Sequence, residues 1–595
     1  MQEPPPPSPA KRIAFRALAV ALPLVAVLLA EGALRLTGVG EVRRAPFQPV
    51  PGHETSVALD PDYGGMFFRD FQPGAAFNPL SRERRSGDLR VLVLGGSTTA
   101  GFPYSWPYAF PARLEDRLAS LLPGRRVEVA NLGMTATNSF TLWALAGPVV
   151  EQRPDAVVVY AGHNEYYGAY GPAGTQGWTG TSTRAKRFLI GASRWALVAG
   201  LSGLVSDGDL PAGERRTLMA RVVRDASVET GGPVYTAGLE QYEANLGDAF
   251  RRFADAGIPV FVGTLTSNLA GQPPLGDEPE ALAAYELGER RLAAGDTAAA
   301  RAAFLDAKEA DGLRFRAPEA INGVVRRLAA AFPNVTLVDV QERFRAESPG
   351  GLEGDALFAD HLHPNARGYA LMADAFAEAM RGALPALRGA PEAVPSPPSV
   401  NAIEAAVARL QLTVLTSGYP FRKDRTPAQA EAVARAQADS LVRTGRLTDA
   451  LAVRVLLDGL PPPNALDEAV REARAASDTL AALRLYGALL RWQPFNEPLM
   501  ETAVGYAAAN AAYDAETEAL ARYAAARSDG PFSLNVLAAI ALRRGDLDRA
   551  DALLSSVEAA APGSPEMLFN RARLLVLRGD TAAARGYFER YQAAR

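Results

Sequence analysis

The sequence predicts an α/β domain built on a parallel, doubly wound sheet, followed by an all-α region of repeated helix pairs. Three observations lead to this expectation. Short apolar runs alternate with helical stretches from residue 88 onward, one apolar run passes directly into a Gly-Gly-Ser turn at 95–97, and a short motif near the C-terminus recurs after 34 residues. Alternating strands and helices are typical of parallel sheets, whereas repetition at that period is typical of helical solenoids.

The alternating part of the chain contains five strand candidates. They lie at 89–94, 126–130, 156–161, 259–265 and 335–340. The first of them ends in four apolar residues, Val91 to Leu94, which is typical of a parallel strand buried between two layers of helices. The helices that separate and follow the strands are expected at 110–122, 138–151, 239–256, 318–332 and about 366–380.

The first 38 residues predict a membrane-directed segment. Residues 17–30 are uncharged and apolar, and basic residues precede them. This run fits the apolar core of a signal sequence, and it also fits a membrane span of about 20 residues if it continues to about Gly38. We expect an uncleaved single-pass anchor at 1–38 with the rest of the chain on the extracytoplasmic side. A stalk at 39–87 is expected to pack on the next domain.

Two insertions interrupt the α/β domain, which is expected at 88–388. Residues 166–238 are too long for an ordinary connection and predict a lid or a substrate wall. Residues 279–312 have the spacing of one tetratricopeptide helix pair, and a plain helical hairpin fits them equally well. A proline-rich stretch at 389–400 is typical of a linker.

The region 401–595 predicts a tetratricopeptide-like solenoid. The motif Arg544-Gly545-Asp546 recurs as Arg578-Gly579-Asp580, and alanine follows each at similar offsets. Repeats of this kind bury their apolar faces only against their neighbours, which produces a curved array of helix pairs. An irregular helical domain is the alternative.

The composition limits the possible chemistry. The net charge of −4 gives no indication of a nucleic-acid partner. The sequence has no cysteine, which excludes disulfides, a thiol nucleophile and thiolate metal sites. Any chemistry that needs an imidazole must use His53, His163, His361 or His363.

Four short polar motifs follow the predicted strands. Three come directly after strands, namely Gly95-Gly96-Ser97-Thr98, Asn131-Leu132-Gly133 and Gly162-His163-Asn164-Glu165. The fourth, Asp360-His361-Leu362-His363-Pro364, comes shortly after the last strand. Because the carboxyl ends of parallel strands meet at one edge of a sheet, where ligands bind in α/β proteins, we expect the four motifs to lie together.

These motifs contain the residue types that nucleophilic catalysis needs. Serine is a weak nucleophile unless a base removes its proton, and we expect His363 to remove the proton of Ser97. Asp360 stands three residues before His363 and is expected to orient its ring. The developing oxyanion needs hydrogen-bond donors, which we expect to be the backbone N–H groups of Ser97 and Gly133 and the side-chain amide of Asn164.

The four motifs resemble those of the SGNH or GDSL-like hydrolase superfamily, named for its Ser, Gly, Asn and His. The resemblance covers about residues 88–388 and implies a three-layer α/β/α fold with Ser-His-Asp ester hydrolysis or acyl transfer. Carried over by position, it assigns the same roles to Ser97, Gly133, Asn164, His363 and Asp360. Two motifs depart from the usual pattern. The first lacks an aspartate before the serine, as in membrane-anchored bacterial members, and Glu165 stands where an aspartate is common.

Further residues near the motifs are candidates for contact with the substrate. His163 and His361 flank the motif residues, although structural histidines are common beside an active site. Arg314 and Arg316 are suited to a carboxylate or a phosphate, and a solvated or ion-paired arginine pair is the alternative. We expect no cofactor, and no metal, because His361 and His363 have no evident third ligand.

The leading functional hypothesis is an anchored serine esterase that acts on an ester-bearing substrate, with acyl groups on cell-surface glycans as the substrate class. An O-acyltransferase would use the same residues and differ only in the acceptor. The alternative from another class is an interaction scaffold, in which the solenoid binds a protein partner and the α/β domain is vestigial.

Overall fold

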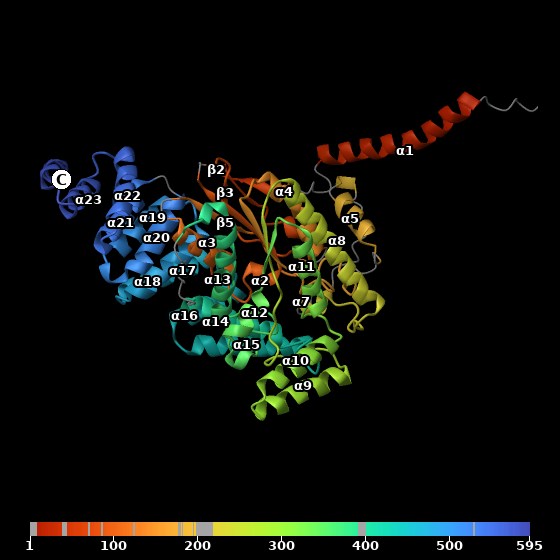
Figure 1. Cartoon of the computed structure of the whole chain (residues 1–595). Coiled ribbons are helices and arrows are strands. Elements are labelled where there is room, and N and C mark those ends of the chain that lie inside the picture. The colour runs from red at the N-terminus through yellow and green to blue at the C-terminus, as the bar shows by residue number, and fades with distance from the viewer. Residues whose placement is uncertain are drawn as a thin grey trace, which may run out of the picture.

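The computed structural model in Figure 1 describes most of the chain. The described residues are 9–37, 45–68, 72–84, 87–122, 125–175, 180, 182–193, 195–197, 218–390, 400–527 and 530–595. The expected linker at 389–400 therefore lies almost entirely outside the described residues, and so does the middle of the expected lid, from 198 to 217.

A five-stranded parallel sheet forms the centre of the α/β domain, as the sequence predicted. In order across the sheet, the strands are β5 (Val127–Asn131), β4 (Leu89–Gly95), β6 (Ala156–Tyr160), β7 (Val260–Gly263) and β8 (Val335–Val338). Every residue of β4 and β6 is buried, because both strands lie inside the sheet with helices on either face. Gly95 pairs with Tyr160, so the segments that follow β4 and β6 leave the sheet side by side.

Helices cover both faces of this sheet and complete the expected three layers (Figure 1). One layer contains α4 (Ser139–Glu151), α8 (Pro233–Asp255) and α11 (Glu319–Ala331). The other contains α3 (Phe110–Leu121), α12 (Val340–Glu347) and α13 (Ala366–Ala383). Short 3-10 helices lie at η1 (Tyr63–Met66), η2 (Trp106–Tyr108), η4 (Pro349–Gly351) and η5 (Pro385–Leu387).

The expected stalk contains a second sheet that the sequence did not predict. Its antiparallel strands are β1 (Phe47–Val50), β2 (His53–Leu59) and β3 (Leu80–Ser81). Leu59, Phe67 and Leu80 are buried in the same apolar core as the parallel sheet, and the Ser81 N–H donates to Glu128 on β5 at 3.0 Å. Short strands among prolines and glycines leave no period of two in the sequence, which is why this sheet was not expected.

The two insertions contain helices. The first carries α5 (Thr183–Ala192) and α7 (Leu218–Val222), and the second carries the hairpin of α9 (Pro279–Ala293) and α10 (Thr297–Ala310). In the hairpin, a Cβ atom on Gly288 would lie 2.6 Å from the Phe304 ring. The glycine therefore allows the close crossing of α9 and α10.

From residue 402 onward the chain is a run of helices. They are α14 (Ala402–Thr416), α15 (Pro427–Arg443), α16 (Leu447–Leu457), α17 (Pro462–Ala475), α18 (Thr479–Trp492), α19 (Glu497–Ala508), α20 (Asp514–Arg527), α21 (Pro531–Arg544), α22 (Leu547–Ala560), α23 (Pro565–Leu577) and α24 (Thr581–Ala594), with η6 (Ala511–Tyr513) before α20. Each helix contacts the next one along the chain, and α21 also contacts α23. This arrangement is compatible with the predicted repeats.

The recurring Gly-Asp dipeptide explains how the chain turns between paired helices. Gly545 and Gly579 end their helices with φ of 76° and 85°, which favours glycine, and the following Asp546 and Asp580 cap the next helix by accepting a backbone N–H. The α9–α10 hairpin uses the same turn, with Gly295 at φ 79° and Asp296 as the cap.

A buried ion cluster joins the helical region to the α/β domain. Arg491 on α18 donates to Glu115 at 2.7 Å and to Asp116 at 2.5 Å, and Arg527 on α20 donates to Glu115 at 2.6 Å. Burial alone would raise the pKa of the Glu115 carboxyl, but the two guanidinium groups hold it below its ordinary value. Glu115 is therefore a charged anchor point for α18 and α20 on the surface of α3.

The N-terminal helix α1 (Pro9–Thr37) extends away from the rest of the chain in Figure 1. Residues Phe15–Thr37 are long and apolar enough to cross a membrane, with a mean hydropathy of 2.3, and a signal sequence has the same properties. Glu31 accepts backbone N–H groups from Ala196 and Leu197 at 2.9 Å each, so the end of α1 is bound to the first insertion.

Replacing Arg491 by alanine tests the ion cluster. Removing one partner leaves Asp116 and part of Glu115 without a cation, and we expect a loss of about 3 kcal/mol in the free energy of unfolding. Chemical unfolding of the full chain measures this loss. Arg290→Ala is the control, because its contact with Glu286 is exposed on both sides and should contribute less than about 0.5 kcal/mol. Equal effects of the two substitutions would contradict a stabilising role for the cluster.

Candidate active site

The turn after β4 brings Ser97 to the carboxyl edge of the sheet. Ser97 is the first residue of the short helix α2 (Ser97–Ala100), and its side chain is largely buried. A Cβ atom on Gly95 would lie 2.3 Å from the Tyr160 carbonyl oxygen, and one on Gly96 would lie 2.9 Å from the Asn164 amide nitrogen. Glycine is therefore required for β4 to end against β6 with Asn164 close to the serine.

Ser97, His363 and Asp360 form a continuous hydrogen-bonded chain. The Ser97 Oγ atom lies 2.7 Å from His363 Nε2, and His363 Nδ1 lies 2.7 Å from Asp360 Oδ2. Because an ionised carboxylate only accepts hydrogen bonds, Nδ1 carries the ring proton and Nε2 is the acceptor for the serine hydroxyl. Phe102 packs on the His363 ring with 4.6 Å between ring centroids and restricts its tilt.

The carboxylate of Asp360 is fixed by its own loop. Its Oδ1 atom accepts the backbone N–H groups of Leu362 at 2.9 Å and His363 at 2.8 Å. Burial alone would raise the pKa of Asp360, but His363 and His361 outweigh burial and hold it well below the ordinary value. The carboxylate therefore stays ionised and holds the imidazole in one orientation.

Asn164 and Glu165 connect this site to the neighbouring helices. Asn164 lines the cavity beside Ser97, and its amide also donates to the Thr137 carbonyl at 3.1 Å. The Glu165 carboxylate accepts from Ser139 Oγ at 2.8 Å and from Gln241 at 2.7 Å. The glutamate, which replaces the more usual aspartate, therefore reaches the first turn of α4 and also α8.

A cavity of about 420 Å³ opens directly onto Ser97 and His363. Besides these two and Asn164, its lining is mainly apolar. The other lining residues are Phe102, Thr135, Ala136, Tyr167, Gly168, Met219, Val222, Phe315, His361, Leu362, Gln411, Val414, Leu415, Leu456 and Leu457. The last five belong to α14 and α16, so the helical region forms one wall of the cavity.

Gly133, expected as an oxyanion donor, lies away from this cavity. Its N–H donates to the side chain of Asn131 at 2.9 Å, and a Cβ atom on it would lie 2.5 Å from the backbone nitrogen of Ala100. The glycine therefore serves the close packing of this loop on α2, and its N–H already has an acceptor. The expectation for Gly133 is wrong in this structure.

Ala136 occupies the position that was expected for Gly133. It lines the cavity with Ser97 and Asn164, and it has a left-handed backbone with φ of 62°. Among the described residues, nothing accepts a hydrogen bond from its N–H. A left-handed residue other than glycine costs about 1–3 kcal/mol and is commonly found at functional sites. This position could not be predicted from the sequence, because a left-handed turn is usually indicated by a glycine and the residue here is an alanine.

The two further histidines have different positions. His163 is buried outside the cavity, where Nδ1 accepts the Ala317 N–H at 3.1 Å, and burial lowers its pKa to about 3. This neutral ring has a structural role rather than the expected contact with the substrate. His361 does line the cavity, and burial lowers its pKa as well.

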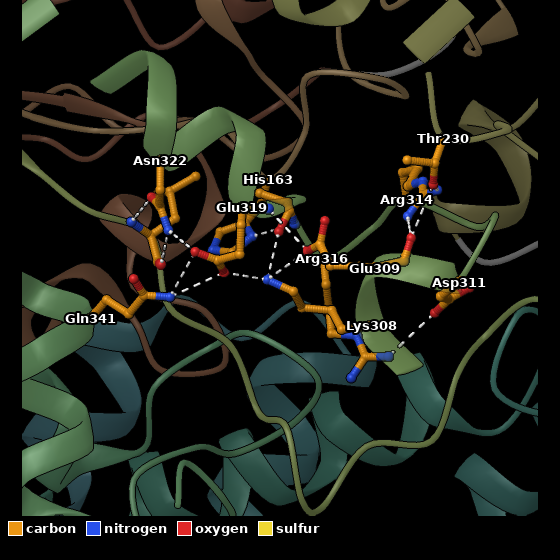
Figure 2. A network of polar contacts seen from close by, with 12 residues as sticks. His163, Thr230, Lys308, Glu309, Asp311, Arg314, Arg316, Glu319, Asn322 and Gln341 are labelled. Atoms are coloured by element: carbon orange, nitrogen blue, oxygen red, sulfur yellow. Dashed lines mark hydrogen bonds and ion pairs between the residues drawn. The ribbon is translucent and has the colours of Figure 1, made fainter. Parts of the chain in front are cut away.

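Arg314 and Arg316 bind the protein itself rather than the cavity, which contradicts the prediction of substrate contact (Figure 2). Arg314 donates to the Val228 and Glu309 carbonyls and to Thr230. Arg316 donates to the Asn268 and Gln272 carbonyls and to Asp311. Both guanidinium groups fasten the second insertion to the domain, and only Phe315 between them reaches the cavity. Spacing alone could not reveal these internal acceptors.

In the same network, Lys308 on α10 donates to Glu319 on α11 at 2.6 Å (Figure 2). Burial alone would raise the pKa of Glu319, but Lys308 lowers it below the ordinary value. This contact fixes the second insertion against the layer that contains α11.

Asp360, His361 and His363 are close enough for their ligand atoms to lie within 4.8 Å of one another. This proximity does not make a suitable metal site, however. Both oxygens of Asp360 already accept hydrogen bonds, and His363 Nε2 faces the serine hydroxyl. A cation bound to these atoms would displace the contacts that join the three side chains.

A parallel sheet in three layers, with a hydrogen-bonded serine, histidine and aspartate at its carboxyl edge, defines the class of α/β/α serine hydrolases. Residues 93–371 match the model of the GDSL-like lipase/acylhydrolase family. These residues are similar to that family, and the match supports a hydrolase that acts on ester bonds. The helices from α14 onward lie outside the match.

Comparison with solved structures finds several similar chains. A catalytic mutant of an acetylxylan esterase from Geobacillus stearothermophilus is 17% identical, covering 51% of this chain and 97% of that chain with a TM-score of 0.27. The lipase/acylhydrolase from Enterococcus faecalis is 15% identical, covering 51% and 100% with a TM-score of 0.27. A GDSL-like lipase from Bacteroides thetaiotaomicron is 12% identical, covering 51% and 93% with a TM-score of 0.27. No curated protein matches the chain.

Glu165 gives a test of the buried part of the site. Burial raises its pKa to about 7, from 4.5 for the ordinary glutamate. Between these two values only the unfolded chain loses the proton, so this residue lowers the free energy of unfolding as the pH rises from about 4.5 to 7. We expect Glu165→Gln to remove this decline.

The measurement is the melting temperature of both proteins at steps of pH between 4.5 and 8. The difference between the two curves isolates the effect of Glu165 from that of other titrating groups. The change of this difference with pH does not depend on any constant loss of stability from changed hydrogen bonds. Glu151→Gln, on the exposed end of α4, is the control and should give a curve parallel to the wild type. A parallel curve for Glu165→Gln would contradict the raised pKa.

Proposed function

We propose that this protein is a serine hydrolase of carboxylic esters in which Ser97 is the nucleophile, His363 the general base and Asp360 the residue that orients His363. The observation that carries the proposal is the pair of 2.7 Å contacts that join the three side chains in the cavity wall. Serine needs such a base to become nucleophilic at neutral pH. Asp360 favours the tautomer in which Nε2 can accept the serine proton.

The proposed reaction takes place in two steps, acylation of Ser97 and deacylation by water. Ser97 Oγ bonds to the ester carbonyl carbon while its proton moves to His363 Nε2, and the carbon–alkoxy bond breaks as that proton passes to the leaving alcohol. Water then gives a proton to His363 and its oxygen to the acyl carbon, and the proton returns to Ser97 as the acid leaves. Each tetrahedral intermediate carries one negative oxygen that needs donors.

We assign these donors to the backbone N–H groups of Ser97 and Ala136 and to the side-chain amide of Asn164. The N–H of Ser97 is in the first turn of α2, where it has no acceptor within the helix. Ala136 supplies a further N–H beside it in the cavity lining, in place of the originally expected Gly133. Asn164 can donate through the same amide nitrogen that lies close to Gly96.

Acyl groups on cell-surface glycans are the substrate class we propose, on the basis of location. Helix α1 has the length and composition of a membrane anchor, and Glu31 near its end binds the backbone of the first insertion. Such contacts support an uncleaved anchor that holds the hydrolase domain at the extracytoplasmic surface of a membrane.

Acyl transfer is a second candidate function, and the burial of the site favours it. Ser97, Asp360 and His363 each expose less than one tenth of their surface, and apolar side chains surround the cavity. A site that limits the access of water favours transfer of the acyl group to a bound hydroxyl acceptor over hydrolysis.

The helical region is also proposed to bind a protein partner through tetratricopeptide-like repeats. A groove of about 690 Å³ on the last helices supports this proposal. Phe569, Val576 and Phe588 line the groove and are partly exposed. The complete hydrogen-bonded chain at Ser97 favours an active enzyme with such an attachment over a vestigial scaffold.

Replacing Ser97 by alanine tests the proposed nucleophile. We expect the turnover of a carboxylic ester by the full chain to fall at least about 10³-fold, because no other group can form the acyl-enzyme. A fluorophosphonate probe should modify the wild type at Ser97, identified by mass spectrometry, and should leave Ser97→Ala unmodified. Turnover and labelling that survive in the variant would contradict the assignment.

Replacing Asn164 by alanine tests the oxyanion site separately. We expect kcat to fall by about 10²–10³-fold with little change in KM, because the lost donor acts mainly in the transition state. Asn334→Ala is the matched control, since that side chain bonds the Ile258 carbonyl far from the cavity and should leave kcat unchanged. An unchanged kcat for Asn164→Ala would remove it from the oxyanion site.

A further inference from the structure

The cavity at Ser97 is built from two parts of the chain that are far apart in sequence. The hydrolase domain supplies the polar floor with Ser97, Asn164 and His363. Helices α14 and α16 supply the opposite wall, mainly with Leu415, Leu456 and their neighbours, and both helices lie beyond the end of the family match at residue 371. The family's sequence pattern therefore does not encode this wall.

Three kinds of contact hold this wall in place. Glu404 on α14 accepts the backbone N–H of Ser105 at 3.0 Å, in the segment that follows α2. Phe421, just after α14, packs on the His361 ring with 5.2 Å between centroids. Leu415 packs against an apolar cluster that contains Tyr167 and Met219 of the first insertion and also Phe315. The wall is thus a fixed part of the site.

The size and lining of the cavity indicate what occupies it. Its volume of about 420 Å³ lies within the range of about 300–1,000 Å³ that is typical of small-molecule sites. At about 30 Å³ for a water-sized group, it has room for roughly a dozen such groups. An acetyl group would leave most of this apolar space empty, whereas a chain of about eight carbons would fill much of it.

We propose that this cavity is an acyl-chain site, bordered on one side by α14 and α16, that selects esters of medium-chain fatty acids. The inference rests on the proposed function, because it takes Ser97 as the nucleophile. The acyl part is assigned to the cavity because it stays bonded to Ser97 Oγ after the alcohol has left with the serine's proton. The alcohol, by contrast, leaves the site and is replaced by water or an acceptor, so it has less need of a fitted apolar wall.

The first experiment measures chain-length preference with p-nitrophenyl esters from acetate to dodecanoate, using the full chain and Ser97→Ala as the blank. Each methylene buried against the cavity wall should raise kcat/KM about threefold to fourfold. We expect a rise from two carbons to a maximum near eight, followed by a decline when the chain exceeds the cavity. A parallel series of alkyl acetates, which lengthens the alcohol instead, should give a flat response.

The second experiment changes the wall. Leu415→Trp and Leu456→Trp fill the cavity and should lower the ratio of octanoate to acetate specificity constants at least about tenfold. Leu456→Ala enlarges the cavity and should move the maximum to longer chains. Val442→Trp is the control, because Val442 on the neighbouring α15 is 51% exposed and outside the cavity, so the ratio should equal that of the wild type.

The ratio within one variant does not depend on how much of the protein is folded, so a poorly folding variant still gives a result. If a tryptophan variant has no measurable turnover, the result for Leu456→Ala tests the proposal instead. The acyl-chain site is overturned if Ser97-dependent hydrolysis is present but kcat/KM is flat or falls with chain length. It is also overturned if the dependence follows the alcohol, or if the wall variants keep the ratio of Val442→Trp. Absence of Ser97-dependent hydrolysis for every ester overturns the proposed function instead.

Discussion

The close approach of β4 to β6 at Gly95 is the constraint on which the rest of the site depends. The carbonyl of Tyr160 and the side chain of Thr99 occupy the space that any side chain at position 95 would need. This contact turns the chain into α2 at once and leaves Ser97 at the sheet edge. It also puts the segment after β6, which carries Asn164, beside the serine. The loop with Asp360 and His363 then completes the site from the other end of the domain.

The hydrogen-bonded chain of Ser97, His363 and Asp360 could be predicted because each motif is local and has a residue type that few other roles require. Only two residues separate Asp360 from His363, so these side chains lie close together. A serine after Gly-Gly at the end of an apolar strand can lie only near the carboxyl edge of the sheet in an α/β fold. The five parallel strands could also be predicted, since buried strands such as β6 form continuous apolar runs.

The site predictions that were wrong share one physical cause. The positions of these residues depend on tertiary contacts that the sequence pattern does not reveal. Gly133 was expected in the cavity because glycine allows close approach, but the close approach it allows is to Ala100 on α2. The left-handed turn at the cavity is instead at Ala136. Its positive φ results from the surrounding structure, and an alanine in the sequence does not indicate such a φ. For Arg314 and Arg316 the sequence left substrate contact and ion pairing open, and the structure pairs both with groups of the protein itself.

The apolar wall from α14 and α16 was likewise beyond prediction, since it depends on how two regions dock. The docking itself is specified by charge: Glu115 would be costly to bury alone, and Arg491 and Arg527 from two different helices neutralise it. This pairing fixes the position of the helical region relative to the α/β domain. In that position α14 reaches the segment after α2 through Glu404 and also borders the cavity.

If Ser97 is the nucleophile, as proposed, the apolar wall beside it bears on the fate of the acyl-enzyme. The acyl-enzyme forms only after the alcohol has departed, and its lifetime depends on what reaches the carbonyl carbon next. With an apolar wall over the cavity, bulk water has limited access to the side of Ser97 where the acyl group lies. The acceptor must then approach from the side of His363, which activates whichever hydroxyl group arrives, whether water or an alcohol. Under the proposed mechanism, the shape of the approach to His363 sets the balance between hydrolysis and transfer, and the wall from the helical region sets which acyl group is carried.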